Sequence, residues 1–339
     1  MRVLSMDGTY LDAALRNLGH EVLSIGQGQD CDVVLTSPLS PHALNELLRS
    51  RNFQPDMGLW CDTCRPPQIF GLEALPCPLV GYSIDQYCNP WHVPYSALFD
   101  HMLLAQKNFL PAFDRPDLPR GVEWAPLFCD PLKDLPGQEE RDIPVSFVGT
   151  LNPPLNPGRK PFLEGFKRLH PLVHLSGNYV PIFARSRIVL NQSCVGELNF
   201  RVFQAMACGA AVLTEGTDNG LGEIFGLGVE VLTYPRGNEA AAAETARSAL
   251  ADPGLPRLAE AGRAAALARH STTARALRVL ELGRDLAARR TWTWRRHQAP
   301  VLRHELGMAY AMLASDPSLP LPDNYRGLLV RTAAQMGQA

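Results

Sequence analysis

The chain has 339 residues, of which 46% are hydrophobic and 19% are charged, and its formal net charge is −2. This length and composition fit about two globular domains, each with a sizeable core. A charge so close to zero excludes the strongly basic surface of a nucleic-acid-binding protein. No apolar run reaches the roughly 18 residues that cross a bilayer, so we expect a soluble protein without a transmembrane segment.

The amino-terminal residues and the cysteines both favour a cytoplasmic location. Residues 1–15 carry one arginine and only a short apolar run before Asp7, so we expect a first strand and not a signal peptide. The eight cysteines are scattered, mostly in apolar surroundings, which is typical of buried reduced thiols. Cys61 and Cys64 form a CxxC pair that could be half of a zinc or redox site. No second pair of cysteines or histidines stands at ligand spacing, so we expect no metal.

Short apolar segments alternate with helical segments over the first part of the chain. This alternation predicts a doubly wound α/β domain with about four or five parallel strands. The turn after the first strand lacks a GxGxxG sequence, so we do not expect NAD binding. The predicted strands are residues 2–6, 21–26, 32–37, 57–62 and 78–85, and the predicted helices are residues 10–18 and 42–51.

Polar residues follow several of these strands, and Asp85 is the most suggestive of them. It precedes an aromatic, proline-containing segment that includes Trp91, His92 and Tyr95. Aromatic faces suit sugar rings, and His92 is a candidate general base near its unperturbed pKa. Asp85 and His92 are therefore candidate catalytic residues. The alternative is a turn aspartate and a loop packed under the sheet.

A segment rich in proline and charge, residues 114–142, predicts a linker at its end. We therefore expect a first domain over residues 1–140 and a second over residues 141–288. Residues 289–339 form a tail of about two or three helices, broken by prolines between residues 316 and 322. The tail's arginines and tryptophans, from Arg289 to Arg296, either contact an anionic acceptor, a membrane surface or a protein, or pack on the first domain with their charges in water.

The second domain opens with a buried strand over residues 143–148, followed by Gly149 and Thr150 and by a helix that begins with Arg159 and Lys160. A glycine lets backbone N–H groups approach a phosphate, and a hydroxyl and a cation complete such a site. Either cation could equally be a solvated helix residue. Gly177 follows the next strand, where a nucleotide base could pack.

Residues 187–215 read as a strand, a polar loop, a helix from Asn199 to Gly209 and a second strand. The amino end of that helix favours an anion such as a diphosphate. The polar residues Glu197, Asn199, Arg201 and Gln204 gather at this end. Backbone groups of the glycine-rich loop that follows, at Asn219, Gly220 and Leu221, are further candidates for contacts with the sugar or phosphate.

The sequences FVGT, IVLN, NFRVFQAMACG and VLTE resemble the signature of nucleotide-sugar glycosyltransferases with two Rossmann-like domains, of the group 1-like and spore-maturation type. The resemblance covers residues 143 to about 285. It implies that the second domain binds the donor, that the first binds the acceptor and that no metal is obligatory. It also implies donor contacts for Gly149, Thr150, Arg159, Lys160, Gly177, Asn199, Arg201, Gln204, Asn219, Gly220 and Leu221. Glu197, beside the position of an acid of the family pattern, joins Asp85 and His92 as a candidate catalytic residue.

The chain departs from the family pattern at its acidic pair. Gln204 stands where related enzymes place an acid that binds the donor ribose, and Gly196, followed by Glu197, stands where they place the other. The resemblance implies sugar transfer from a nucleoside-diphosphate sugar to a glycan, protein or small-molecule acceptor, without a cofactor and with retention slightly favoured. The alternatives are a nucleotide-sugar epimerase and a catalytically degenerate nucleotide-sugar-binding protein.

Overall fold

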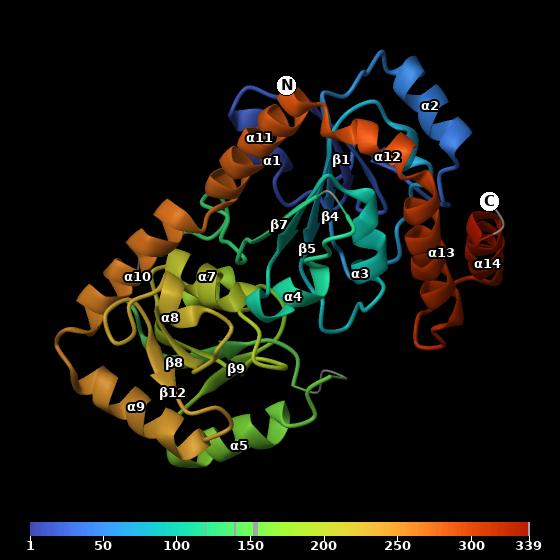
Figure 1. Cartoon of the computed structure of the whole chain (residues 1–339). Coiled ribbons are helices and arrows are strands. Elements are labelled where there is room, and N and C mark those ends of the chain that lie inside the picture. Colours follow the sequence, from blue (N-terminus) through green and yellow to red (C-terminus); the bar gives the residue numbers. More distant parts are fainter. Residues whose placement is uncertain (119, 139, 152–154, 338–339) are drawn as a thin grey trace. The chain divides into compact units, whose positions relative to one another are not determined.

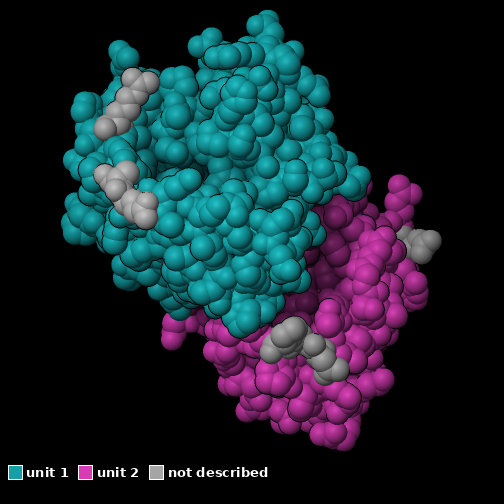
Figure 2. Space-filling model, turned by 90° about the vertical axis from the view of Figure 1, so that its right-hand side faces the viewer, with its two compact units in different colours: residues 1–125, 276–339 teal, residues 126–275 magenta. Residues whose placement is uncertain are grey.

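The computed structural model describes residues 1–118, 120–138, 140–151 and 155–337. These residues form two compact units, which Figure 2 colours separately. Unit 1 contains Met1–Ala125 and Ala276–Ala339, and unit 2 contains Pro126–Arg275. The sequence predicted the boundary near residue 140, but residues 126–138 belong to unit 2. Cys129 forms a β-bridge with Ser271, and the Tyr179 hydroxyl donates to Asp134, so this proline-rich stretch is part of unit 2 rather than a free linker.

Unit 1 is built on a parallel sheet of seven strands in the order β3-β2-β1-β4-β5-β6-β7. Its strands are nearly continuous apolar runs, as expected where both faces of a parallel sheet are covered. The predicted four or five strands are too few, because the sheet also contains β6 and β7. The strands are β1 (Arg2–Asp7), β2 (Glu21–Gly26), β3 (Val33–Val34), β4 (Met57–Cys61), β5 (Leu79–Ser83), β6 (His101–Leu104) and β7 (Gly121–Trp124).

Helices cover both faces of this sheet (Figure 1). The helices at the carboxyl end of the chain belong to the same unit. A continuous core joins β1, β4 and β5 to the carboxyl-terminal helices through Trp60, Tyr95, Phe99 and Tyr310. The helices of unit 1 are α1 (Asp12–Asn17), α2 (Pro41–Ser50), η1 (Leu72–Ala74), α3 (His92–Tyr95), η2 (Ser96–Leu98), η3 (Lys107–Phe109), α4 (Leu110–Phe113), η4 (Thr291–Thr293), α12 (Trp294–His297), α13 (Ala299–Ser315) and α14 (Asp323–Gly337), with α11 (Thr272–Arg289) leading in from unit 2.

The tail packs on the first sheet through a buried ion pair. Arg295 pairs with Asp100, and both side chains are essentially inaccessible to solvent. The Trp294 indole donates to the same carboxylate at 3.1 Å, and Arg295 donates to the carbonyls of Leu75 and Cys77. The sequence placed the charges of this basic segment in water. That expectation is wrong for Arg295, because Asp100 and two carbonyls replace its hydration.

Unit 2 contains a parallel sheet of five strands in the order β12-β11-β10-β8-β9. The strands are β8 (Ile143–Val148), β9 (Val173–Leu175), β10 (Ser186–Asn191), β11 (Ala211–Glu215) and β12 (Leu232–Tyr234). The helices are α5 (Arg159–Leu169), α6 (Val180–Phe183), α7 (Phe200–Ala207), α8 (Leu221–Ile224), α9 (Glu239–Ala251) and α10 (Leu255–Arg269). Helices α5 and α9 pack together on one face, and α7 and α10 pack together on the other (Figure 1).

The predicted strand-loop-helix-strand segment is present as β10, α7 and β11. Val202, Phe203, Ala205 and Met206 are fully buried, which fixes the apolar face of α7 against the sheet. Gly209 follows the helix at φ +79°, a left-handed conformation that suits glycine and turns the chain directly into β11.

Each sheet reverses its direction of winding at one place. In unit 2, β8 leads through α5 to β9 on one side, while β10 leads through α7 to β11 on the other, so the reversal lies between β8 and β10. In unit 1 it lies between β1 and β4. Doubly wound sheets bind ligands at the carboxyl ends of the strands at such a point. No helix among the described residues is long and apolar enough to cross a membrane.

Candidate functional site

Arg201 occupies the winding reversal of unit 2, on the first turn of α7. Its Nε donates to the Val148 carbonyl at 3.1 Å, and its Nη1 donates to Asn191 Oδ1 at 2.7 Å. Its guanidinium also lies 4.3 Å from the centre of the Phe147 ring. A Cβ on Gly149 would come within 2.6 Å of Arg201 Nη2, so a side chain here would displace the guanidinium.

Arg159 brings a second cation to the same place from the start of α5. It is 8% exposed, its Nε donates to Gln192 Oε1 at 3.0 Å, and its Nη1 donates to the Thr150 carbonyl at 3.2 Å. Its guanidinium also lies over the Phe147 ring, 5.7 Å from the centre of that ring. Helices α5 and α7 therefore place Arg159 and Arg201 together at the winding reversal. Each arginine donates there to a backbone carbonyl and to an amide side chain.

The environment of Arg201 disfavours its charge. Burial, reinforced by the charge of Arg159, lowers the pKa of Arg201 to about 9. Arg201 donates to a backbone carbonyl and to an amide oxygen, and no carboxylate among the described residues lies within ion-pair distance of it. A partly buried cation without a carboxylate partner would be stabilised by a bound anion.

Three of the other predicted donor residues lie at or beyond the edge of this cluster. Lys160 is exposed and pairs with Glu164 on its own helix at 3.8 Å. Gly177 is exposed at φ +99°, with open space where a Cβ would stand. Thr150 is exposed and contributes its carbonyl to Arg159. The structure therefore brings Gly149, Thr150, Arg159 and Arg201 together, but it turns Lys160 toward solvent.

The residues around α7 have two different kinds of environment. Asn199 is the residue before the helix, and its buried Oδ1 has no hydrogen-bond partner. Gln204 is half-buried one turn after Arg201. Glu197, a predicted catalytic residue, accepts the backbone N–H of Cys194 at 2.8 Å and that of Val195 at 2.7 Å, one with each carboxylate oxygen. Its carboxylate therefore holds the loop before α7 in shape.

The glycine-rich loop after β11 contributes mainly buried side chains. Asn219 is 3% exposed and Leu221 is 1% exposed, and Gly220 stands at φ +86° immediately before α8. Glu215, at the end of β11, was not predicted. One of its oxygens accepts from both the backbone and the hydroxyl of Ser193, and the other accepts from the Gly237 N–H. The sequence signal that could have indicated Glu215 is an acidic residue at the end of a buried strand, in the sequence VLTE.

Unit 1 has a polar cavity of about 270 Å³ at its own winding reversal. Asp7 ends β1 there in the left-handed region, at φ +65°, and the Trp60 indole donates to its Oδ2 at 2.9 Å. Burial raises the pKa of Asp7 to about 7, although the Trp60 hydrogen bond opposes the shift. The sequence analysis did not select this residue. The cavity is lined by Asp7, Gly8, Thr9, Tyr10, Gln27, Gly28, Asp30, Thr63, Arg65, Pro66 and Gln68.

The predicted catalytic residues of unit 1, Asp85 and His92, lie after β5. His92 is 1% exposed, its Nδ1 is 2.8 Å from the Ser83 hydroxyl, and its Nε2 is 3.5 Å from Asp62 Oδ1. Burial lowers the pKa of His92 below its ordinary value, so the expected unperturbed imidazole is wrong. Asp85 is half-buried, and one of its oxygens accepts from the Cys64 thiol at 2.7 Å.

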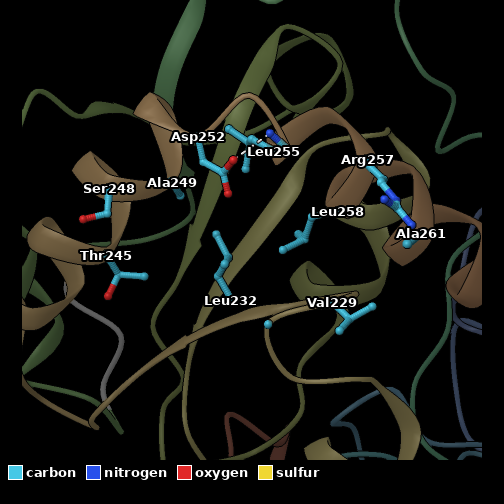
Figure 3. Close-up of a pocket in the computed structure, with 12 residues that line it drawn as sticks. Val229, Leu232, Thr245, Ser248, Ala249, Asp252, Leu255, Arg257, Leu258 and Ala261 are labelled. Carbon is cyan, nitrogen blue, oxygen red and sulfur yellow. Dashed lines mark hydrogen bonds between the residues drawn. The ribbon is translucent and has the colours of Figure 1, made fainter.

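A larger cavity of about 520 Å³ lies elsewhere in unit 2, between α9, α10 and the end of β12. Figure 3 shows that Leu232, Leu258 and Val229 face it, with Asp252 at its rim. Asp252 accepts the backbone N–H of Gly254 at 2.7 Å, which fixes the turn between α9 and α10. The cavity contains none of the predicted site residues, and its lining brings no cluster of reactive groups together.

Comparisons with known proteins agree with this architecture. Residues 126–281 match the family model described as glycosyl transferase-like, and no curated protein matches the chain. A glycosyltransferase from Rickettsia africae ESF-5 superposes with a TM-score of 0.60 at 10% identity, over 84% of this chain and 98% of that one. Anabaena Alr3699/HepE in complex with UDP-glucose gives 0.60 at 13% identity, over 83% and 99%. AviGT4, a glycosyltransferase of avilamycin A biosynthesis, gives 0.56 at 17% identity, over 85% and 98%.

The low identities make these structures evidence for the fold alone. The family match covers all of unit 2, which is less than half of the chain. The spore-maturation subtype stays a prediction. Residues 126–281 are thus similar to glycosyl transferase-like proteins, and most of the chain shares the two-domain fold of solved glycosyltransferases.

Proposed function

We propose that the protein transfers a sugar from a nucleoside-diphosphate sugar to a hydroxyl-bearing acceptor, with no metal at the diphosphate. The observation that carries this proposal is the pair Arg159 and Arg201 at the winding reversal of unit 2. The Anabaena protein of the same fold was solved with UDP-glucose, which supports a nucleotide-sugar donor here as well.

The leaving group of this reaction is a nucleoside diphosphate, whose negative charge grows as the bond to the sugar breaks. The Arg201 guanidinium lies next to Gly149, where no side chain separates it from a phosphate oxygen. The N–H groups at the start of α7, beside Asn199, add the positive end of the helix dipole. These groups are held in position by Val148, Asn191 and Gln192 before substrate arrives, so they stabilise the transition state with little reorganisation.

We propose that the cavity beside Asp7 binds the acceptor. Its lining offers hydroxyl, amide, carboxyl and guanidinium groups, a mixture that suits the hydroxyls of a sugar or similar polar acceptor. The carboxylate of Asp7 accepts the hydrogen bond of the reacting hydroxyl and, with a pKa of about 7, can take up its proton. His92 and Glu197 are not part of this proposal, because His92 is fully buried and both Glu197 oxygens hold backbone N–H groups.

Retention of the anomeric configuration is the finer part of the proposal and follows from the resemblance to retaining families. In a retaining reaction the acceptor's proton can pass to a carboxylate such as Asp7 or to the leaving phosphate, so a role for Asp7 does not by itself decide between retention and inversion. The anomeric signal of the product in proton nuclear magnetic resonance distinguishes the two. An inverted product would overturn retention and leave sugar transfer intact.

The experiment that tests the donor site compares two arginines of unit 2. Arg201→Ala removes the site cation, and Arg168→Ala removes an exposed arginine from the last turn of α5. Thermal shifts with UDP, ADP, GDP, CDP and TDP first identify the nucleotide, because a ligand of the folded state raises the Tm. We expect Arg201→Ala to weaken its binding roughly 10-fold to 100-fold, the value of a charge-assisted hydrogen bond. Arg168→Ala should leave it unchanged.

Equal nucleotide affinity in wild type and Arg201→Ala would overturn the donor site. Gln204 and Gly196 in place of an acidic pair favour a second candidate, a protein that binds the nucleotide sugar without transferring it. That candidate predicts saturable binding with no transfer and no hydrolysis across an acceptor panel. Release of nucleoside diphosphate that depends on an acceptor would exclude it.

A further inference from the structure

The loops that follow β4 and β5 bring two thiols and two carboxylates together in unit 1. The Cys64 thiol donates to Asp85 Oδ2 at 2.7 Å and is also hydrogen-bonded to the Cys88 thiol. The Asn89 amide lies 3.7 Å from Cys64 Sγ and 3.4 Å from Cys88 Sγ. One ligand atom each from Asp62, Cys64 and Asp85 lies within 4.8 Å of the others.

The carboxylate of Asp62 fixes the geometry of both loops. Its Oδ1 accepts the Cys64 N–H at 2.7 Å, and its Oδ2 accepts the Asp85 N–H at 2.9 Å. The side chain is fully buried, so these bonds are shielded from water. Asp62 therefore holds the backbone that presents the Cys64 thiol and the Asp85 carboxylate to one point.

A buried histidine beside this cluster has one ring nitrogen that makes no hydrogen bond to any described residue. His92 Nε2 makes no hydrogen bond and lies 3.5 Å from Asp62 Oδ1, while the other ring nitrogen is engaged by Ser83. Leaving a buried ring nitrogen unpaired is unfavourable. Carboxylates in metal sites are commonly held by hydrogen bonds from a surrounding residue, and His92 is placed to supply one to Asp62 when a cation draws the carboxylates together.

We propose that Cys64, Cys88 and Asp85 bind a thiophilic divalent cation, with Zn²⁺ as the best fit. The two soft thiolates favour Zn²⁺ over Mg²⁺ or Ca²⁺, which prefer oxygen ligands alone, and Zn²⁺ also accepts a carboxylate. Binding converts both thiols to thiolates and releases their protons to solvent, and three protein ligands leave the fourth tetrahedral position to water. Cys64 is exposed and Cys88 is half-buried, so a cation can reach them.

This site differs from the one that the CxxC spacing suggested. Cys61 is fully buried in β4, where its Cα is paired with Asp7, and its thiol is not part of the cluster. The partner of Cys64 comes instead from the loop after the next strand. Thr63 and Arg65, which flank Cys64, line the cavity at Asp7, so a bound cation would also hold one wall of that cavity. The proposal does not depend on the donor site of unit 2.

Cobalt(II) titration of the full chain, kept reduced with a phosphine, tests the site. We expect one equivalent to bind with the near-ultraviolet absorption of thiolate-to-cobalt charge transfer and the visible bands of tetrahedral geometry. Cys64→Ser and Cys88→Ser should each lose at least half of the charge-transfer intensity, and Asp85→Asn should weaken binding roughly 10-fold or more while the thiolate band is retained. Cys194→Ser, which removes a half-buried thiol from unit 2, is the matched control.

Zinc supplies a second measurement that does not depend on colour. Equimolar Zn²⁺ should raise the Tm of the wild type and of Cys194→Ser but not of Cys64→Ser, and circular dichroism checks that each variant is folded. The proposal is overturned if cobalt binds without a thiolate band, or if the band survives in both Cys64→Ser and Cys88→Ser. Spontaneous disulfide formation between Cys64 and Cys88 together with no uptake of metal by the reduced chain would also overturn it.

Discussion

The two sheets carry opposite charges at the same topological position. At the reversal between β8 and β10, unit 2 presents Arg159 and Arg201, whereas unit 1 presents Asp7 at the reversal between β1 and β4. Both sets of side chains follow the carboxyl ends of parallel strands. The doubly wound fold therefore fixes where a ligand binds, and the residues after each strand decide whether that ligand is an anion or a proton donor.

A second difference concerns how each unit treats a buried cation. Arg295 in unit 1 is paired with Asp100 and is closed off from solvent. Arg201 in unit 2 has oxygen partners without full charge, and its pKa is lowered to about 9. A paired cation holds the structure together, whereas an unpaired one is a cost to folding that substrate binding can offset. Under our proposal, Arg295 stabilises the fold and Arg201 binds the diphosphate.

The largest effect that we expect is on turnover, from Asp7→Asn. The amide keeps the shape and can still contact Trp60, but it cannot take up a proton. We expect kcat to fall by about 10²-fold to 10⁴-fold with nucleotide affinity unchanged. In the wild type, activity should rise with pH through about 7, as the carboxylate forms. Glu46→Gln, at an exposed position of α2, is the control. A variant with the wild-type pH profile would remove Asp7 from the reaction.

The next largest effect contrasts the two arginines. Arg295→Met leaves Asp100 as an unpaired buried charge, which should lower the free energy of unfolding by about 3–5 kcal/mol. Arg201→Met removes a cation that has no carboxylate partner among the described residues, so we expect a change below about 1 kcal/mol. Urea unfolding of unliganded protein measures both. Equal losses would mean that Arg201 also serves mainly to hold the fold.

The sequence predicted the unit 2 segment almost residue for residue. The predicted strand from residue 187 and the helix from residue 199 correspond to β10 and α7, because a buried apolar run and a Gly209 stop are local signals. Arg201 and Gly149 were selected from the same local patterns. The structure places these two residues side by side although they are far apart in sequence, and local patterns do not show that proximity.

What the sequence did not reveal depends on burial and on pairing between distant residues. Asp7 looks like any turn aspartate until Trp60 and the sheet enclose it and raise its pKa to about 7. Arg295 looks like one more surface cation until Asp100 meets it. His92 is a third example: a histidine is a candidate general base from its residue type, but this one is buried inside unit 1. Residue type predicts chemistry well only where the degree of burial is also known.

A smaller effect concerns stability and again involves Asp7. Its folded pKa of about 7 lies above the value near 4 of an unfolded aspartate, so the folded state binds the proton more tightly. The protonated side chain of Asp7 therefore stabilises the folded state fully below pH 4, and this stabilisation is lost as the pH rises to about 7. Asp7→Asn should raise the free energy of unfolding by about 1–3 kcal/mol at pH 8, after allowance for partial exposure, and by much less at pH 4. A pH-independent difference would contradict the raised pKa.

The smallest effect should come from Gln204→Glu, which restores the acid of the family pattern one turn after Arg201. A carboxylate binds a ribose hydroxyl more strongly than an amide does, so donor affinity should rise by up to about tenfold. The new charge would also lie near Arg201 and supply some of the neutralisation that unit 2 otherwise takes from its ligand. If that second effect dominates, affinity for the nucleoside diphosphate falls while the unliganded protein becomes more stable. Calorimetry with the nucleotide and urea unfolding without it separate the two outcomes, and tighter binding would place Gln204 at the ribose.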